Sequence, residues 1–290
     1  MANNLLKFDS IGFEASQVLQ RNAFAEVYGT SSKGIYLQTK NDLTLFISFE
    51  NFRGPLTLNY SGDPNVFSEI KPRSSVNIKA GNIIFPAVGL KGSIKNIEPW
   101  VPEDPPAFIK LEKGFLKDLF RQCKSLVGDD PFFPLLEVVF SGKSIPLPGF
   151  PDFFERTVYL SRSLNSGVVS NLAWEIEKFM GAGPGLTPLG DDLILGILLA
   201  INRGKHSFYS ESFLDQLNQS TIDLALDKTT RLSFSLLVCA SDGSADERLL
   251  KVLYGLLAGA VIRDQDLTRI LEWGSTSGFA VLAGMILALQ

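Results

Sequence analysis

The segment that most constrains the fold of this chain is a proline-rich stretch about one third of the way along it. Residues 98–106 read Glu-Pro-Trp-Val-Pro-Glu-Asp-Pro-Pro. Proline interrupts both helices and central strands, so neither kind of element can run through this stretch. The hydrophobic pattern changes at the same place, from strand-like to helical. The chain is therefore predicted to divide into a β-rich N-terminal domain, residues 1–105, and a helical domain, residues 106–290.

The N-terminal part is a series of short runs rich in β-branched and aromatic residues, with turn-forming residues between them. Strands are predicted at residues 23–29, 34–39, 43–49, 56–60, 75–78 and 83–85. Many short strands close together in the sequence favour a small barrel or a sandwich over βαβ units.

The C-terminal part shows helical periodicity. An amphipathic helix is predicted over residues 111–127. Thr187 followed by Pro188 is typical of an N-cap with proline in the first helical position, and this helix should run to about Asn202. The sequence Ser244-Ala-Asp-Glu247 predicts a capping box, and a final helix is expected through residues 279–289. The fold class is therefore predicted to be α+β.

Composition excludes several classes of function. A formal net charge of −4 argues against a general nucleic-acid-binding protein. The longest apolar runs, residues 193–201 and 279–289, are shorter than the roughly 20 residues of a membrane helix. Cys123 and Cys239 follow no metal-binding spacing and indicate a reducing compartment, so we expect a cytoplasmic protein without membrane partners. The one histidine, His206, is expected in a solvated loop. The lack of a second histidine and of a cysteine cluster argues against a zinc site with nitrogen and sulfur ligands.

The most informative segment reads Gly-Ala-Gly-Pro-Gly-Leu-Thr-Pro-Leu-Gly-Asp-Asp and covers residues 181–192. Glycines at alternating positions, among them Gly183 and Gly185, permit sharp turns and leave backbone N–H groups accessible. They lead into a helix N-terminus, where N–H groups and the helix dipole favour an anion. The alternative is a tight turn without a ligand. The segment is neither a dinucleotide-binding fingerprint nor a P-loop, since no lysine follows the last glycine.

Asp191 and Asp192 conflict with a simple anion site, because two carboxylates would repel a phosphate. Either a divalent cation such as Mg²⁺ binds to Asp191 or Asp192, or the carboxylates accept hydrogen bonds from a substrate N–H group. A carbamoyl or oxamate amide would suit the second arrangement. Both alternatives require at least one of the two side chains to point into the site.

Two later segments could contribute to the same site. Thr229 or Thr230 can cap the helix that begins near Arg231, and Arg231 could bind a carboxylate or phosphate through two parallel hydrogen bonds. Residues 274–278 read Gly-Ser-Thr-Ser-Gly and form a hydroxyl-rich turn before the last helix. The simpler interpretations are a surface ion pair for the arginine and plain capping for the hydroxyls.

In combination, these three segments resemble the AllH-like family, named for a subunit of bacterial oxamate carbamoyltransferase. The shared features are the motif at residues 181–192, Thr-Thr-Arg-Leu-Ser at 229–233, and Gly-Ser-Thr-Ser-Gly at 274–278 followed by Leu-Ala-Gly at 282–284. The resemblance implies a subunit of an assembly that interconverts carbamoyl phosphate plus oxamate with oxalurate plus phosphate. It also implies two partners, an FdrA-like subunit and a second large subunit.

The resemblance also suggests which residues act. It implies catalytic roles for Asp191, Asp192 and Arg231, and binding of a small anionic substrate by Gly183, Gly185, Thr187, Thr230, Ser277 and Gly278. Many relatives have a histidine in the 274–278 turn where this chain has Ser275, which puts a proton-shuttle role in doubt. Two other functions remain open. One is a divalent-metal-dependent hydrolase or phosphotransferase, and the other is a non-catalytic subunit that binds a ureide metabolite.

Overall fold

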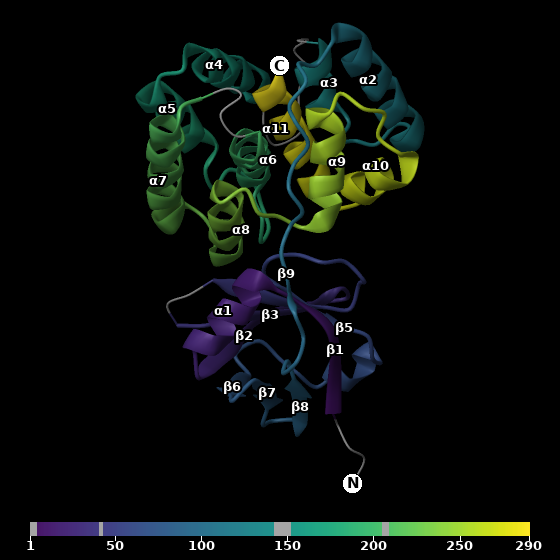
Figure 1. Cartoon of the computed structure of the whole chain (residues 1–290), viewed down its shortest axis with the longest axis vertical. Helices are drawn as coiled ribbons and strands as arrows, with labels where there is room; N and C mark the ends of the chain where they lie inside the picture. Colours follow the sequence, from purple (N-terminus) through teal and green to yellow (C-terminus); the bar gives the residue numbers. More distant parts are fainter. Residues whose placement is uncertain (1–4, 41–42, 142–151, 205–208) are drawn as a thin grey trace. The chain divides into compact units, whose positions relative to one another are not determined.

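The computed structural model describes the chain except for residues 1–4, 41–42, 142–151 and 205–208 (Figure 1). The chain forms two compact units, Met1–Glu103 and Asp104–Gln290. The division between them falls inside the proline-rich stretch at 98–106. His206 lies outside the described residues, so its expected exposure stays a prediction.

The first unit is built around a closed sheet. Its strands are β1 (Leu5–Gly12), β2 (Phe24–Ser31), β3 (Gly34–Gln38), β4 (Thr44–Ser48), β5 (Thr57–Tyr60), β6 (Ser75–Lys79), β7 (Asn82–Phe85), β8 (Leu90–Ser93) and β9 (Pro99–Trp100). The sheet order is β5-β4-β3-β2-β6-β7-β8-β1-β9, and β5 also pairs with β1. Because β1 pairs with both β5 and β8, eight strands close into a barrel, and β9 is added beside β1. Of the two predicted forms, the barrel is the one observed.

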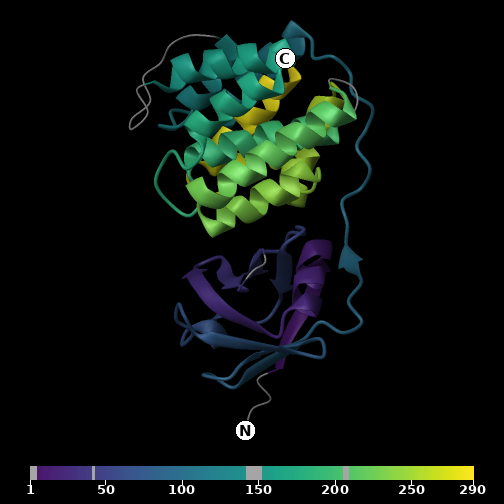
Figure 2. The ribbon, with the colours of Figure 1, turned by 90° about the vertical axis from the view of Figure 1, so that its left-hand side faces the viewer.

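Two elements near the N-terminus were not anticipated. The strand β1 closes the barrel, and the helix α1 (Phe13–Arg21) follows it directly. Figure 2 shows α1 beside the barrel strands, where Ala15, Val18 and Leu19 are buried. The N–H of Ala15 donates to the carbonyl of Pro55 at 2.9 Å, which ties the start of α1 to the loop before β5. A short 3₁₀ helix, Pro64–Phe67, precedes β6.

The second unit is helical, as predicted, and the α+β fold class is confirmed. Its helices are α2 (Lys113–Val127), α3 (Pro134–Ser141), α4 (Phe153–Ser166), α5 (Val169–Phe179), α6 (Leu189–Arg203), α7 (Glu211–Lys228), α8 (Arg231–Ser241), α9 (Glu247–Leu257), α10 (Asp264–Leu271) and α11 (Ser277–Leu289). In Figure 1, α4, α5, α7 and α8 lie on one side of α6 and α11, and α2, α3, α9 and α10 lie on the other.

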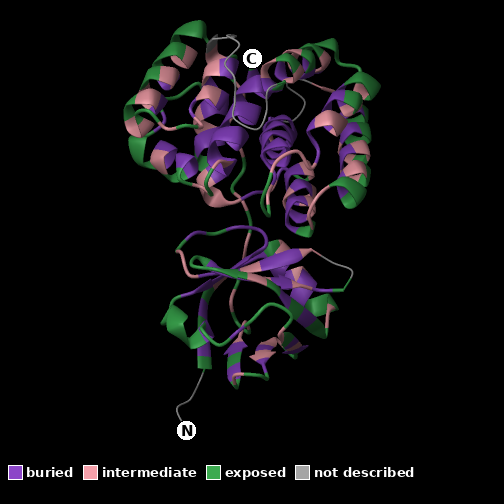
Figure 3. Ribbon diagram, turned by 180° about the vertical axis from the view of Figure 1, so that it is seen from behind, coloured by how far each residue is buried: buried purple, intermediate pink, exposed green. Residues whose placement is uncertain are grey.

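The centre of this unit is the pair α6 and α11, which are buried over nearly their whole length (Figure 3). Helices that are apolar all round require such burial. Glycines bring the two backbones together: a Cβ on Gly196 would lie 2.1 Å from the Val281 carbonyl oxygen, and one on Gly284 would lie 2.0 Å from that of Leu193. The close contact between the two backbones therefore fixes α6 and α11 against each other at the centre of the unit.

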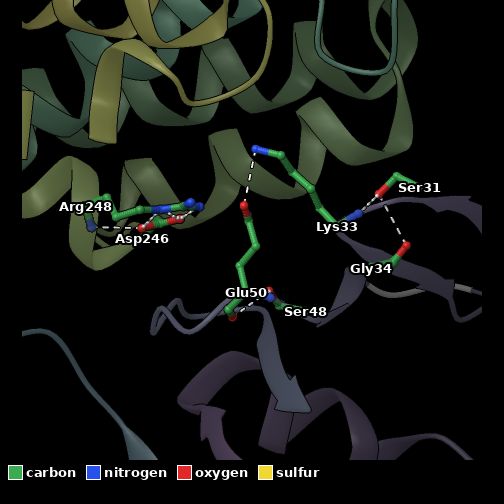
Figure 4. A network of polar contacts seen from close by, with 7 residues as sticks. All are labelled: Ser31, Lys33, Gly34, Ser48, Glu50, Asp246 and Arg248. Carbon is green, nitrogen blue, oxygen red and sulfur yellow. Dashed lines mark hydrogen bonds and ion pairs between the residues drawn. The ribbon is translucent and has the colours of Figure 1, made fainter. Parts of the chain in front are cut away.

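Two of the predicted helix caps are wrong. Pro188 has an extended ψ of 142° and is itself the N-cap of α6, so Thr187 lies one residue outside the helix. The cap of α9 is Asp246, not Ser244. Its carboxylate accepts from the Arg248 N–H at 2.8 Å and also pairs with the Arg248 side chain, as Figure 4 shows. Ser244 still belongs to the end of α8, since its N–H donates to the Cys239 carbonyl at 2.7 Å.

Among the helices of the described residues, none is both long and apolar enough to cross a membrane.

Candidate functional site

The three segments singled out in the sequence meet at the N-termini of α6, α8 and α11. Asp191, in the first turn of α6, joins the first two segments. Its Oδ1 accepts from the Gly181 N–H at 2.6 Å, and its Oδ2 accepts a short hydrogen bond from the Thr229 hydroxyl. A second link runs from the Thr230 hydroxyl to the Leu186 carbonyl at 2.5 Å. The glycine-rich turn is therefore fastened to the segment between α7 and α8.

The third segment is joined to the first through hydroxyl groups. Thr187 Oγ1 and Ser277 Oγ lie 3.1 Å apart and share a hydrogen bond. Gly278 allows the start of α11 to lie close to the end of α10, because a Cβ there would lie 1.7 Å from the Ile270 carbonyl oxygen. Its N–H donates to the Trp273 carbonyl at 2.9 Å. The helix α11 thus begins directly against the end of α10, with Ser277 facing the glycine-rich turn.

Glycine conformation shapes the first segment. Gly181, Gly183 and Gly185 all have positive φ, at 72°, 120° and 102°. At Gly181 there is also no space for a side chain, since a Cβ would lie 2.2 Å from the Lys228 carbonyl oxygen. At Gly185 no heavy atom lies within 4 Å, so only the backbone conformation requires glycine. Residues 184–186 are exposed, and the turn therefore presents its tip to solvent.

Asp192 is a buried acidic residue of the site whose carboxyl group lacks hydrogen-bond partners on one oxygen. Its side chain is buried, with 1% of the residue exposed, and its Oδ2 has no hydrogen-bond partner. Neither Asp191 nor Asp192 is paired with a cation in the described part of the chain. A buried carboxylate without a cation is costly, which makes this pair unusual among the acidic residues of the molecule.

Burial also controls the ionisation of both groups. It raises the pKa of Asp191 above its ordinary value, while hydrogen bonds from the Gly181 N–H and the Thr229 hydroxyl lower it. Burial raises the pKa of Asp192 well above its ordinary value. The nearby Ser277 hydroxyl opposes that increase, and the nearby charge of Asp191 adds to it. The environment therefore favours a proton on Asp192, and Asp191 is the better stabilised anion.

Several N–H groups at these helix starts are already used within the chain. The Gly190 N–H donates to the Ala182 carbonyl at 2.9 Å, and the Ser233 N–H donates to the Thr230 hydroxyl at 3.1 Å. Thr230 is thus the N-cap of α8, as one of the two predicted alternatives. Arg231 follows it as the first residue of α8 and is exposed.

For a metal ion, the described residues offer no group of three or more His, Cys, Asp or Glu side chains. Both oxygens of Asp191 accept hydrogen bonds from the protein, so a cation would have to displace the Gly181 or Thr229 contact. Asp192 Oδ2 has no such contact. A Mg²⁺ site would therefore depend mainly on Asp192.

The sequence did not assign every residue that builds this site. Thr229 was considered only as a helix cap, yet its hydroxyl binds Asp191. Ser233 is buried and contributes to the same carboxylate environment. The signal available for both was the dense run of hydroxyl residues from 229 to 233, which exceeds what one helix cap needs.

Residues 179–289 match the family model described as oxamate carbamoyltransferase subunit AllH. Residues 179–289 are therefore AllH-like. The match begins just before the glycine-rich turn and ends in α11, so it contains all three segments of the site. The barrel and the helices α2 to α4 lie outside it. No curated protein and no solved structure matches the chain.

Proposed function

We propose that this chain is a subunit of a carbamoyl-transferring enzyme and that it binds a small anionic substrate where the turns 181–187, 228–231 and 274–278 meet. The observation that carries the proposal is the convergence of these turns on Asp191 and Asp192 within the AllH-like segment. Two buried carboxylates without cations cost free energy, and a functional site is where such a cost is expected.

Arg231 supports binding of an anion. It occupies the first turn of α8, where the positive end of the helix dipole makes a cation unfavourable, and that turn contains no acidic residue. A carboxylate or phosphate beside Arg231 would favour both the guanidinium and the helix N-terminus. The exposed turn at residues 184–186 lies close by through the bond from Thr230 to Leu186.

The carbamoyl group could form hydrogen bonds with three side chains of the site, those of Asp192, Thr187 and Ser277. An unpartnered carboxyl oxygen on Asp192 can accept a hydrogen bond from a carbamoyl or oxamate N–H. The Thr187 and Ser277 hydroxyls can donate to the oxygen that gains charge at the carbamoyl carbon. Asp191 acts as a positioning residue, because its oxygens hold the turns together. Since Asp192 is 1% exposed, substrate contact requires the glycine-rich turn to open.

The family description supports oxamate carbamoyl transfer as the proposed reaction. In oxamate carbamoyl transfer, the oxamate nitrogen attacks the carbamoyl carbon of carbamoyl phosphate. A C–N bond forms, the C–O bond to phosphate breaks, and the nitrogen loses one proton. The products are oxalurate and phosphate. The chain would work with an FdrA-like subunit and a second large subunit, and no covalent nucleophile is required.

Calorimetric titration of the full chain with oxamate, oxalurate and carbamoyl phosphate tests the proposal. Arg231→Lys keeps the positive charge but loses the planar guanidinium group, which can donate two parallel hydrogen bonds. The binding free energy of the anionic ligand should therefore weaken by about 1.5–3 kcal/mol. Arg269→Lys, at an exposed position on α10, is the matched control and should bind as the parent does. Equal binding by both variants, or no binding by the parent chain, would refute the assignment of this site.

A non-catalytic ureide-binding subunit is the second candidate, and the burial of Asp192 favours it. A closed site can retain a metabolite without turning it over. Turnover of carbamoyl phosphate and oxamate by the isolated chain would exclude this candidate. Saturable stabilisation by Mg²⁺ without substrate, lost in Asp192→Asn, would instead favour the metal-dependent hydrolase or phosphotransferase.

A further inference from the structure

A groove runs between α5 and α7 on the surface of the helical unit. It is lined by residues of both helices: Val168, Val169, Ser170, Ala173, Trp174, Glu177, Asp215, Gln216, Gln219, Ser220, Asp223, Leu224, Asp227 and Lys228. Trp174 is 62% exposed, which is high for so large an apolar side chain. An exposed aromatic ring beside a groove is typical of a surface that another chain covers.

The α7 wall of this groove has an acidic stripe, defined as Asp215, Asp223 and Asp227. With Gln219 these residues follow a four-residue spacing, and all of them are exposed. None of the three carboxylates is paired with a cation in the described residues, and Asp223 accepts only from the Gln219 amide, at 2.8 Å. The lysine at the end of the groove, Lys228, is already paired with Glu177 at 2.5 Å. The stripe therefore lacks countercharges of its own.

The helix α2 has the complementary pattern, a basic stripe defined as Lys113, Lys117 and Arg121. These residues also follow a four-residue spacing, and all are exposed. Arg121 pairs with Asp118 at 3.1 Å, whereas neither lysine pairs with an acid in the described part of the chain. In Figure 1, α2 and α7 lie on opposite sides of the central pair α6 and α11, so one molecule cannot bring the two stripes together.

We propose that the groove between α5 and α7 binds the basic stripe of α2 from a second copy of this chain. Charges four residues apart on a helix rise by about 6 Å per step, so two such stripes can stay in register over their length. Lys178 Nζ already lies 5.5 Å from the centroid of the Trp174 ring, and the exposed remainder of that ring offers apolar surface to the aliphatic stems of the lysines. Such a contact joins unlike surfaces, and association is head to tail. This proposal does not depend on the proposed function.

Sedimentation velocity of the full chain over a wide concentration range tests the proposal. The parent chain should associate, and high salt should weaken the association. Asp223→Lys with Asp227→Lys should lower the association constant by about tenfold or more, because attraction becomes repulsion. Lys113→Glu with Lys117→Glu should have the same effect. Glu26→Lys with Glu69→Lys, at exposed positions of the barrel unit, matches the first charge change and should leave association intact.

Mixing gives the sharpest result. In the α7 double variant both stripes carry more basic than acidic residues, and in the α2 double variant both carry more acidic than basic residues. Each variant alone should therefore associate at least about tenfold more weakly than the parent chain. An equimolar mixture should associate, because each variant supplies the charge that the other lacks. A parent chain that stays monomeric at every concentration would overturn the proposal. So would association that survives both double variants, or a mixture that remains monomeric.

Discussion

The barrel and the helical unit differ in the kind of polar side chain that they bury. Among the described residues, those buried in the barrel unit are neutral: Ser16, Thr39, Thr44, Ser48, Thr57 and Asn59. The helical unit buries four carboxyl groups, those of Glu175, Asp191, Asp192 and Asp266. Neutral polar groups need only hydrogen bonds, whereas a buried carboxylate needs a compensating charge or a proton. The helical unit therefore carries an electrostatic cost that the barrel avoids.

That cost is unevenly distributed. Glu175 pairs with Lys178 at 2.8 Å, and Asp266 pairs with Arg263 at 2.7 Å. Asp191 has a short hydrogen bond from Thr229 and one from Gly181, and Asp192 has an unpartnered oxygen. The two buried carboxyl groups without a cationic partner thus lie at one place, inside the segment that matches the AllH family. Two buried carboxyl groups without cations lower stability, so their presence at this site indicates a functional role.

The largest effect is expected where the helical unit is most tightly packed. Gly284→Ala places a Cβ 2.0 Å from the Leu193 carbonyl oxygen, so α6 and α11 must move apart. We expect a loss of about 3 kcal/mol in the free energy of unfolding. Gly114→Ala, where no heavy atom lies within 4 Å, is the control and should be neutral or slightly stabilising. Denaturant unfolding followed by circular dichroism measures both, and similar results for the two would show that the central pair is not rigid.

A somewhat smaller loss is expected at the junction of the turns. Asp191→Ala removes the acceptor of the Gly181 N–H and the Thr229 hydroxyl, which leaves both donors without a partner. We expect a loss of about 2–3 kcal/mol, in the range for hydrogen bonds to a charged group. Asp191→Asn keeps one acceptor and should lose less. Equal stability of Asp191→Ala and the parent would mean that Asp191 does not hold the turns together.

The sequence predicted local features of both units better than the contacts between distant segments. The strands at residues 34–39 and 43–49 were visible because alternation is local. The role of β1 was not, since it depends on pairing with β5 and β8, about fifty and eighty-five residues away. The three site segments were recognisable as motifs, whereas the bond between Thr229 and Asp191 depends on how α6 and α8 pack.

Helix starts show the same limit. Thr187-Pro188 and Ser244-Ala-Asp-Glu247 satisfy the sequence rules for caps, yet each helix begins one or two residues later. At Thr187 the hydroxyl forms a tertiary hydrogen bond with Ser277, and at Asp246 the carboxylate accepts from the Arg248 N–H at 2.8 Å. A tertiary contact thus accompanies the later start of α6, whereas a local contact sets the start of α9.

The ionisation of Asp192 gives a prediction of moderate size. Its pKa is raised by burial, so the folded state prefers the protonated form. Stability from this group is complete below the ordinary aspartate pKa of about 4 and is lost as pH rises through the folded pKa. Asp192→Asn should therefore be more stable than the parent at pH 8, by about 1–2 kcal/mol, and the gain should disappear near pH 4. Melting temperatures of the two proteins across this range test it, and a constant difference would contradict the raised pKa.

The smallest effect is expected for the charges of the barrel. Lys33 Nζ and Glu50 Oε1 lie 3.3 Å apart, with side chains 50% and 37% exposed (Figure 4). Exposed pairs of this kind contribute little, because water and salt screen the attraction and ordering two long side chains costs entropy. Lys33→Met should change the free energy of unfolding by less than about 1 kcal/mol, and the residual difference should shrink in high salt. Lys79→Met, at an exposed position on β6, is the matched control. A loss well above that of the control would show that the barrel also depends on charge, and the contrast between the two units would then fail.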